Sequence, residues 1–216
     1  MIKDRLLNRL SGDREYKVGV SAKDLQGLAL TDDLKADILA ALSSADLTDV
    51  RLGFFFAEQL VTPQQDSQFE NDLLKISLRL YETNEWNIKS NCVSMFILLG
   101  QKLNNYRELM LRALKDGDAQ VRRKSLLMYC TFAKPGEIEA LEFFENDDYV
   151  TEVGMGSHLI YELRNLALET IEKVTNQKFK KFEKTDVYKA KNVVFWWDWE
   201  PFHKWKNSIW HKLKLT

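Results

Sequence analysis

The sequence predicts an all-α fold, a right-handed α-solenoid of about four to five antiparallel helical hairpins. First, a pair consisting of an aliphatic residue and a cation recurs at the start of four apolar segments: Val50-Arg51, Ile88-Lys89, Val121-Arg122 and Leu163-Arg164. The intervals between the aliphatic residues are 38, 33 and 42 residues, which is typical of stacked helical hairpins. Second, 216 residues contain only nine Gly and three Pro, which favours long helices over many short strands.

We expect one domain over residues 1–216, with an N-terminal cap (1–30), helical repeats (31–175) and an aromatic, basic C-terminal cap (176–216). Thr31 is the predicted N-cap of the first repeat helix, because its short side chain carries an oxygen that can accept from free backbone N–H groups. The partner helix is predicted over residues 49–61. Its predicted inward side chains are Phe54, Phe55, Ala57 and Leu60.

Three further hairpins are predicted downstream. The second covers residues 69–103, and the third covers residues 109–132 with a turn at 115–118. The fourth begins at Ile138 and ends at Val174, and we expect a long loop over residues 146–157 to interrupt it, since that stretch contains two glycines. Such a loop within one repeat often carries the binding site.

The spacing of reactive residues argues against catalysis and metal binding. The three histidines, His158, His203 and His211, match no metal-ligand spacing, and no nucleophile motif is present. Cys92 and Cys130 lie in apolar helical patterns, so both are predicted to be small buried hydrophobes. We therefore expect no metal, no cofactor and no catalytic residue. The glycine-containing stretch 154–157 is predicted to be a flexible loop rather than a phosphate-binding turn.

The start of the chain does not resemble a secretion signal, because charged residues occur at positions 3–5 without a long apolar run behind them. No uncharged apolar run approaches the roughly 18 residues that a membrane span needs. We therefore expect a cytoplasmic protein.

The repeat units resemble HEAT repeats, an α-solenoid family also found in short bacterial proteins, and they also have an armadillo-like character. The closest unit is Asp118-Ala119-Gln120-Val121-Arg122, and the resemblance covers about residues 31–210. The end of the repeats, followed by Trp196-Trp197-Asp198-Trp199, is similar to the tryptophan-rich cap of small bacterial HEAT-like proteins. Asn176 replaces the glycine of that turn, which is acceptable because Asn also adopts left-handed backbone angles. The resemblance implies a protein-binding scaffold.

Charge separates the two ends of the chain, although the net charge is only −1. Residues 173–216 carry +7 and residues 1–172 carry −8. An acidic segment, residues 137–152, contains seven carboxylates and no Lys or Arg. It predicts either a solvated surface or a docking site for a basic protein, with aromatic side chains as anchors. The predicted partner-binding residues are Glu139, Glu142, Phe143, Glu145, Asp147, Asp148, Tyr149 and Glu152.

The function that this segment favours is a non-enzymatic interaction module. Its most concrete form is a bacterial immunity or inhibitor protein that covers a basic toxin or nuclease, since carboxylates compete for a phosphate-binding site. The alternative is a DNA-binding protein, such as an alkylpurine DNA glycosylase of the HEAT-like class, which lines its DNA cleft with tryptophans and an Asp. Trp196 to Trp199 supply those residue types, but a DNA groove needs cations spread along several repeats.

The basic and aromatic tail has two interpretations. Cations interleaved with aromatics can bind single-stranded nucleic acid or a membrane surface. The sequence favours a capping helix instead, because Phe202, Trp205, Ile209 and Leu213 share one helical face.

Overall fold

A computed structural model describes most of the chain. The described residues are 2–8, 22–83, 85–134, 137–153, 158–179, 181–185, 193–197 and 199–213. Two compact units divide the chain, Met1–Tyr106 and Arg107–Thr216. This division does not test the predicted single domain, which stays a prediction.

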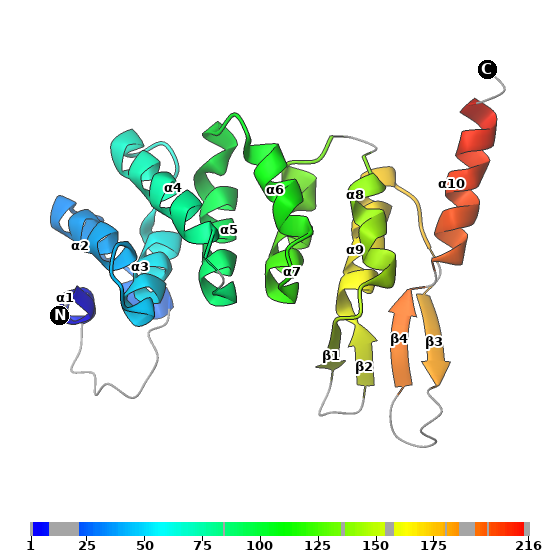
Figure 1. The fold of residues 1–216 in the computed structure, drawn as a ribbon, viewed down its shortest axis with the longest axis horizontal. Helices are drawn as coiled ribbons and strands as arrows, with labels where there is room; N and C mark the ends of the chain where they lie inside the picture. The colour runs from blue at the N-terminus through cyan, green and yellow to red at the C-terminus, as the bar shows by residue number, and fades with distance from the viewer. Residues whose placement is uncertain are drawn as a thin grey trace. The chain divides into compact units, whose positions relative to one another are not determined.

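The secondary-structure elements that the structure describes in the first unit are all helices (Figure 1). α2 packs against α3 and α4, α5 packs against α4 and α3, and α1 contacts both α2 and α3. The elements are α1 (Ile2–Leu7), η1 (Ala22–Leu25), α2 (Asp32–Leu42), α3 (Leu47–Leu60), α4 (Ser67–Tyr81), α5 (Trp86–Leu99) and η2 (Gly100–Lys102).

Side-chain oxygens fix where these helices begin. The predicted N-cap Thr31 is confirmed, because its hydroxyl accepts from the Leu34 backbone N–H at 3.3 Å. Asp46 accepts from the N–H of Thr48 at 2.8 Å, and Asp66 accepts from the N–H of Phe69 at 3.1 Å. Each cap satisfies a backbone donor that the helix itself leaves open.

The core between α2 and α3 is close-packed around a glycine. A Cβ at Gly53 would lie 3.0 Å from Leu42 Cγ and 3.1 Å from Ala41 Cβ, and all three residues are buried. The predicted inward set is partly wrong. Phe54 and Ala57 are buried, but Phe56 takes the place assigned to Phe55.

Phe55 and Leu60 are only half-buried. Three consecutive phenylalanines fit more than one helical stripe, and tertiary packing decides which of them face the core.

The second unit combines helices with a small sheet. α6 (Tyr106–Leu114) begins at the last residue of the first unit, and α9 contacts α7, α8 and η4. The other helical elements are α7 (Ala119–Leu127), η3 (Tyr129–Thr131), α8 (Glu139–Glu142), η4 (Phe143–Asn146), α9 (Glu162–Thr175) and α10 (Glu200–Leu213).

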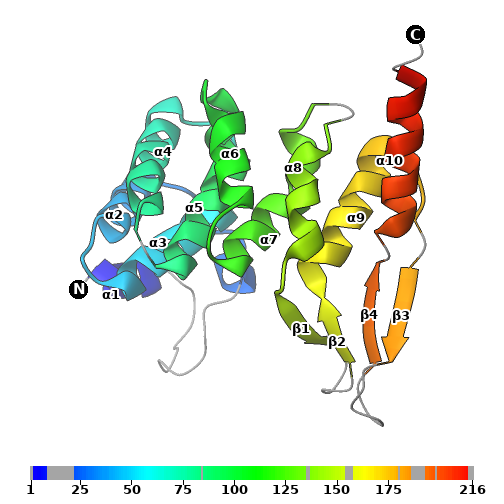
Figure 2. The same ribbon diagram turned by 45° about the vertical axis from the view of Figure 1, so that its right-hand side comes forward.

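The sheet has four strands in the order β1-β2-β4-β3 (Figure 2). β1 (Val150–Val153) pairs antiparallel with β2 (His158–Tyr161), and β3 (Lys181–Thr185) pairs antiparallel with β4 (Val193–Trp197). The two hairpins join through β2 and β4, which run parallel with Ile160 opposite Phe195. α9 connects the hairpins along the chain and packs against β4.

The predicted helical character is confirmed for most of the described chain, but the sequence did not predict the sheet. Part of the expected loop over residues 146–157 is strand β1, and the predicted cap contains β3 and β4 ahead of the capping helix. Short runs rich in β-branched and aromatic residues, such as Val193–Trp197, indicate strands. The helical periodicity of the rest of the sequence nevertheless favours an all-α prediction. Residues 154–157, predicted as a loop, lie outside the described residues.

Two smaller predictions have opposite outcomes. Asn176 ends α9 in the left-handed conformation with φ 55°, as predicted. Cys92 is buried, but Cys130 is exposed. The predicted helix extends through residue 132, but α7 ends at Leu127. Cys130 lies in the 3-10 helix η3 that follows, where its thiol is exposed.

We expect Gly53→Leu to lower the free energy of unfolding by about 1–3 kcal/mol, because the added atoms overpack the contact between α2 and α3. Urea denaturation measures this. Gly117→Leu is the matched control, because a Cβ there meets no atom within 4 Å, and it should change stability by less than about 0.5 kcal/mol. Equal stability of the two variants would contradict the close packing.

Candidate functional site

The four recurring aliphatic residues occupy equivalent environments in the second helix of each predicted hairpin. Val50, Ile88, Val121 and Leu163 are exposed by 2% or less. The cations that follow them lie in different surroundings, and this difference locates the candidate binding surfaces.

Arg122 is buried in an ion pair with the acidic segment. Its Nε donates to Asp147 Oδ2 at 2.9 Å, and the Asp147 side chain is 3% exposed. Its Nη1 donates to the carbonyls of Asp116 and Gly117 at 2.9 and 3.0 Å. The guanidinium therefore neutralises the carboxylate and also donates hydrogen bonds to two backbone carbonyls of the turn before α7.

Other contacts fix Asp147 in place. Its Oδ1 accepts from the Tyr149 N–H at 3.0 Å, and its carbonyl accepts from Arg164 Nε at 2.5 Å. The Arg164 guanidinium also lies 4.0 Å from the centre of the Tyr161 ring. Asp147 is thus a structural residue that joins α7, α9 and the start of β1, although the sequence predicted it to contact a partner.

Two more acids of the segment pair with α10. Lys206 Nζ lies 2.6 Å from both carboxylate oxygens of Glu142, and His203 Nε2 lies 2.8 Å from Glu145 Oε1. The Lys206 and Glu142 side chains are each 26% exposed, so this pair is shielded from water more than a typical surface pair.

The remaining predicted residues differ in accessibility. Glu139 and Asp148 are exposed, and Phe143 is 49% exposed. Tyr149 is half-buried, and its hydroxyl accepts from Gln120 Nε2 at 2.6 Å. Glu152 lies in β1, and its side chain falls outside the described residues. The structure thus leaves Glu139, Phe143 and Asp148 open to solvent.

The start of the capping helix is anchored by aromatic packing. Phe202 is fully buried and makes edge-on contacts with Trp199 and Phe179, whose ring centres lie 5.4 and 5.7 Å away. Trp199 is 7% exposed, so it packs in the core instead of lining an open cleft as the DNA glycosylase alternative requires. Asp198 and the side chains of Trp196 and Trp197 lie outside the described residues.

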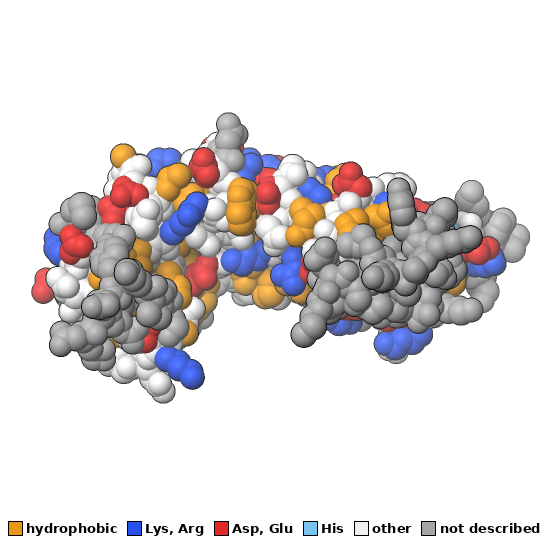
Figure 3. Space-filling model, turned by 90° about the horizontal axis from the view of Figure 1, so that it is seen from below, with side chains coloured by type: hydrophobic (Ala, Val, Ile, Leu, Met, Phe, Trp, Pro, Cys, Tyr) orange, Lys and Arg blue, Asp and Glu red, His pale blue; other side chains and the backbone are white. Residues whose placement is uncertain are grey.

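The described surface seen from below carries no continuous acidic patch (Figure 3). Acidic side chains stand singly there among basic and hydrophobic ones.

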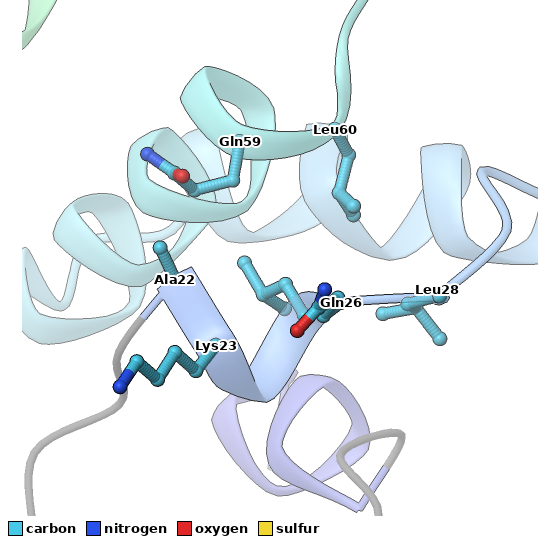
Figure 4. A pocket seen from close by; sticks show the side chains of 8 residues that line it. Ala22, Lys23, Gln26, Leu28, Gln59 and Leu60 are labelled. Carbon is cyan, nitrogen blue, oxygen red and sulfur yellow. The ribbon is translucent and has the colours of Figure 1, made fainter.

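One pocket of the first unit lies between η1 and α3 and has a volume of about 510 Å³. Ala22 and Gln26 line one side of it and Gln59 and Leu60 the other, and the Lys23 side chain extends away from α3 (Figure 4). Its described lining contains no carboxylate, histidine or thiol, so it offers no acid–base pair.

Within the described residues, no group of His, Cys, Asp and Glu is arranged to hold a metal ion. The described helices include none with the length and apolar content to cross a membrane. Comparison with protein-family models, curated proteins and solved structures gave no match.

Asp147 and Asp148 are adjacent in the sequence, but we expect their substitution by alanine to affect stability very differently. Asp147→Ala leaves the buried Arg122 charge unpaired and should lower the free energy of unfolding by about 3–5 kcal/mol. Asp148→Ala, at an exposed position, should change it by less than about 0.5 kcal/mol. Urea denaturation of both variants measures the contrast, and similar losses would contradict the structural role of Asp147.

Tyr129 links the acidic segment to the preceding helical turn. The ring is fully buried, and its hydroxyl donates to the Glu137 carbonyl at 2.8 Å. The Glu137 carboxylate in turn pairs with Arg107. Burial, assisted by the negative charge of Glu139, raises the pKa of Tyr129 to about 12.

This raised pKa predicts a loss of stability in alkali. The phenol has a pKa of about 10 in the unfolded chain. Its contribution to the free energy of unfolding is therefore complete below pH 10 and is lost as the pH rises towards 12. Relative to Tyr129→Phe, the wild-type protein should lose about 2 kcal/mol of unfolding free energy between pH 8 and pH 11.5. Urea denaturation of both proteins at the two pH values measures this. An equal difference in unfolding free energy between wild type and Tyr129→Phe at pH 8 and pH 11.5 would contradict the prediction.

Proposed function

We propose that this protein is a non-enzymatic protein-binding module in which antiparallel helical hairpins stack as a right-handed α-solenoid and the second unit adds the four-stranded sheet. Its partner is a basic protein. The exposed acidic surface formed by Glu139, Phe143 and Asp148 contacts it.

The packing order supports the repeat architecture. In the first unit, α2 and α4 contact each other, and so do α3 and α5, in addition to the contacts within each pair. In stacked hairpins, the first helix of one hairpin is expected to contact the first helix of the next, and likewise for the second helices. Such arrays expose extended surfaces that bind proteins. The burial of all four recurring aliphatic residues agrees with a shared repeat.

An exposed aromatic side chain between acids is the observation that carries the proposal. Phe143 is 49% exposed, and its ring packs edge-on against the buried Phe144 with 5.5 Å between centres. A braced aromatic loses little conformational freedom on binding, which suits an interface anchor. Glu139 lies one helical turn before it and Asp148 five residues after it, and both are exposed, so we expect a partner that covers Phe143 to meet both carboxylates.

The charges set the class of partner. Four acids of the segment, Glu137, Glu142, Glu145 and Asp147, already pair with Arg107, Lys206, His203 and Arg122. Among the acids of the segment whose side chains the structure describes, Glu139 and Asp148 therefore remain to attract a basic partner. Opposite charges on a partner would speed encounter and fix orientation, and an apolar pocket for Phe143 would supply the larger share of affinity. A basic toxin or nuclease with an exposed phosphate-binding site is the form of partner that we propose.

The test is affinity capture from cells that produce the protein, followed by binding measurements with the captured partner. Phe143→Ala should weaken binding by more than about tenfold, because truncation of an aromatic anchor removes 2 kcal/mol or more. The double variant Glu139→Lys/Asp148→Lys should slow association, and its rate should depend less on salt.

Leu47→Ala is the control, because it removes an exposed apolar side chain of the first unit and should leave this binding unchanged. A partner that binds Phe143→Ala as tightly as the wild type would overturn the proposed surface. Tight, salt-sensitive binding of a 20-base-pair DNA duplex in fluorescence anisotropy, with no protein partner, would favour the DNA alternative.

A further inference from the structure

A second surface lies in the first unit, in a groove between α3 and α5. Its volume is about 360 Å³. Trp86 at the start of α5 is 46% exposed, although a tryptophan is usually largely buried. The residues that line the groove are Arg51, Phe55 and Glu58 of α3 and Trp86, Asn87, Ser90 and Asn91 of α5.

Arg51 differs from the other recurring cations. Arg122 and Arg164 are engaged with Asp147, and Lys89 lies 5.8 Å from the centre of the Tyr81 ring. Arg51 is exposed and makes no hydrogen bond or ion pair to any other residue that the structure describes. Its guanidinium is therefore available to an anionic group in the groove.

The α5 side of the groove carries polar side chains that are available in the same sense. Asn87, Ser90 and Asn91 are half-buried and have no side-chain hydrogen bond within the described part of the chain. Each asparagine amide presents both donors and an acceptor. A peptide group needs one donor and one acceptor, so these side chains match a polypeptide backbone.

The spacing fits an extended chain. Residues four apart on a helix are separated by about 6 Å along its axis. In an extended strand, side chains on one face repeat every two residues, which is about 6.6 Å. Arg51 and Phe55 on α3, like Asn87 and Asn91 on α5, therefore match successive same-side positions of an extended peptide.

We propose that the groove between α3 and α5 binds an extended peptide segment that carries a carboxylate two residues away from a large apolar side chain. Arg51 binds the carboxylate, Phe55 and Trp86 contact the apolar side chain, and Asn87 and Asn91 hydrogen-bond to the peptide backbone. This site is separate from the exposed acidic surface of the second unit, and its partner has the opposite charge.

The charge of the groove argues against nucleic acid. Glu58 lies on the same stripe of α3 as Arg51, so the ionisable lining has no net positive charge. A polynucleotide would place a phosphate near each position along the groove, including the carboxylate end, whereas a peptide can present one acid beside neutral residues.

The test uses the full chain and a fluorescein-labelled nonapeptide with both ends capped, in which Glu and Leu lie two residues apart in a Gly/Ser background. We expect saturable binding in fluorescence anisotropy. Arg51→Glu should weaken it by at least about tenfold, since a charge-assisted hydrogen bond is lost and a repulsion is added. The same variant should prefer a peptide with Lys in place of Glu. Trp86→Ala should also weaken binding.

Three controls make the result specific. Arg79→Glu introduces the same change at an exposed position of α4 outside the groove and should bind like the wild type. A peptide with Glu and Leu adjacent should bind more weakly, because the two side chains then point to opposite faces. Phe143→Ala should bind the nonapeptide normally, which separates this site from the proposed function.

Absence of saturable binding at 1 mM peptide, measured with variants whose circular dichroism matches the wild type, would overturn the proposal. Equal binding by Arg51→Glu and the wild type would also overturn it. Tighter binding of a fluorescein-labelled 12-nucleotide oligo-dT, with loss of that binding in Arg51→Glu, would reassign the groove to nucleic acid.

Discussion

The ion pair between Arg122 and Asp147 is the contact on which the second unit depends. It lies in the core, where an unpaired charge would carry a large desolvation cost. Both members of the pair make further hydrogen bonds, because Arg122 Nη1 donates to two carbonyls of the turn before α7 and Asp147 Oδ1 accepts from the Tyr149 N–H. Because the same aspartate holds Arg164 of α9 through its carbonyl, the pair fixes the path of the chain from α7 through η4 to β1. An apolar pair of the same volume would pack there as well, but it would not fix which groups meet.

This pairing changes the meaning of the charge distribution in the sequence. The sequence predicts that the acidic segment is either a solvated surface or a docking site for a basic protein. In the structure, Glu142 and Glu145 face Lys206 and His203, so part of the basic tail neutralises part of the acidic segment within one unit. These two contacts attach the start of α10 to the acidic segment, while Glu139 and Asp148 stay exposed.

Local signals allowed much of the helical framework to be predicted. Thr31 and Asn176 mark helix ends through their own side-chain chemistry, and the buried Val50, Ile88, Val121 and Leu163 follow from helical periodicity. The sheet depends on pairing between residues far apart, such as Ile160 with Phe195, which no local pattern specifies. The sequence pattern also could not reveal which acids are exposed, because Asp147 and Asp148 are identical in type and adjacent. Burial separates them, and burial is a property of the tertiary structure.

A recurring cation in a helical repeat can serve two purposes, and the neighbouring residues decide which. Where another segment supplies a buried carboxylate, as Asp147 does for Arg122, the cation forms an internal ion pair and stabilises the fold. Around Arg51 the groove supplies amides, a hydroxyl and an exposed indole, and the one carboxylate of its lining, Glu58, lies about two turns away along the same helix. A guanidinium in such a setting keeps its hydration and its full set of donors until another molecule displaces the water. The recurring pair of aliphatic residue and cation therefore supplies a cation that stabilises the second unit, Arg122, and one that stays exposed in the first, Arg51.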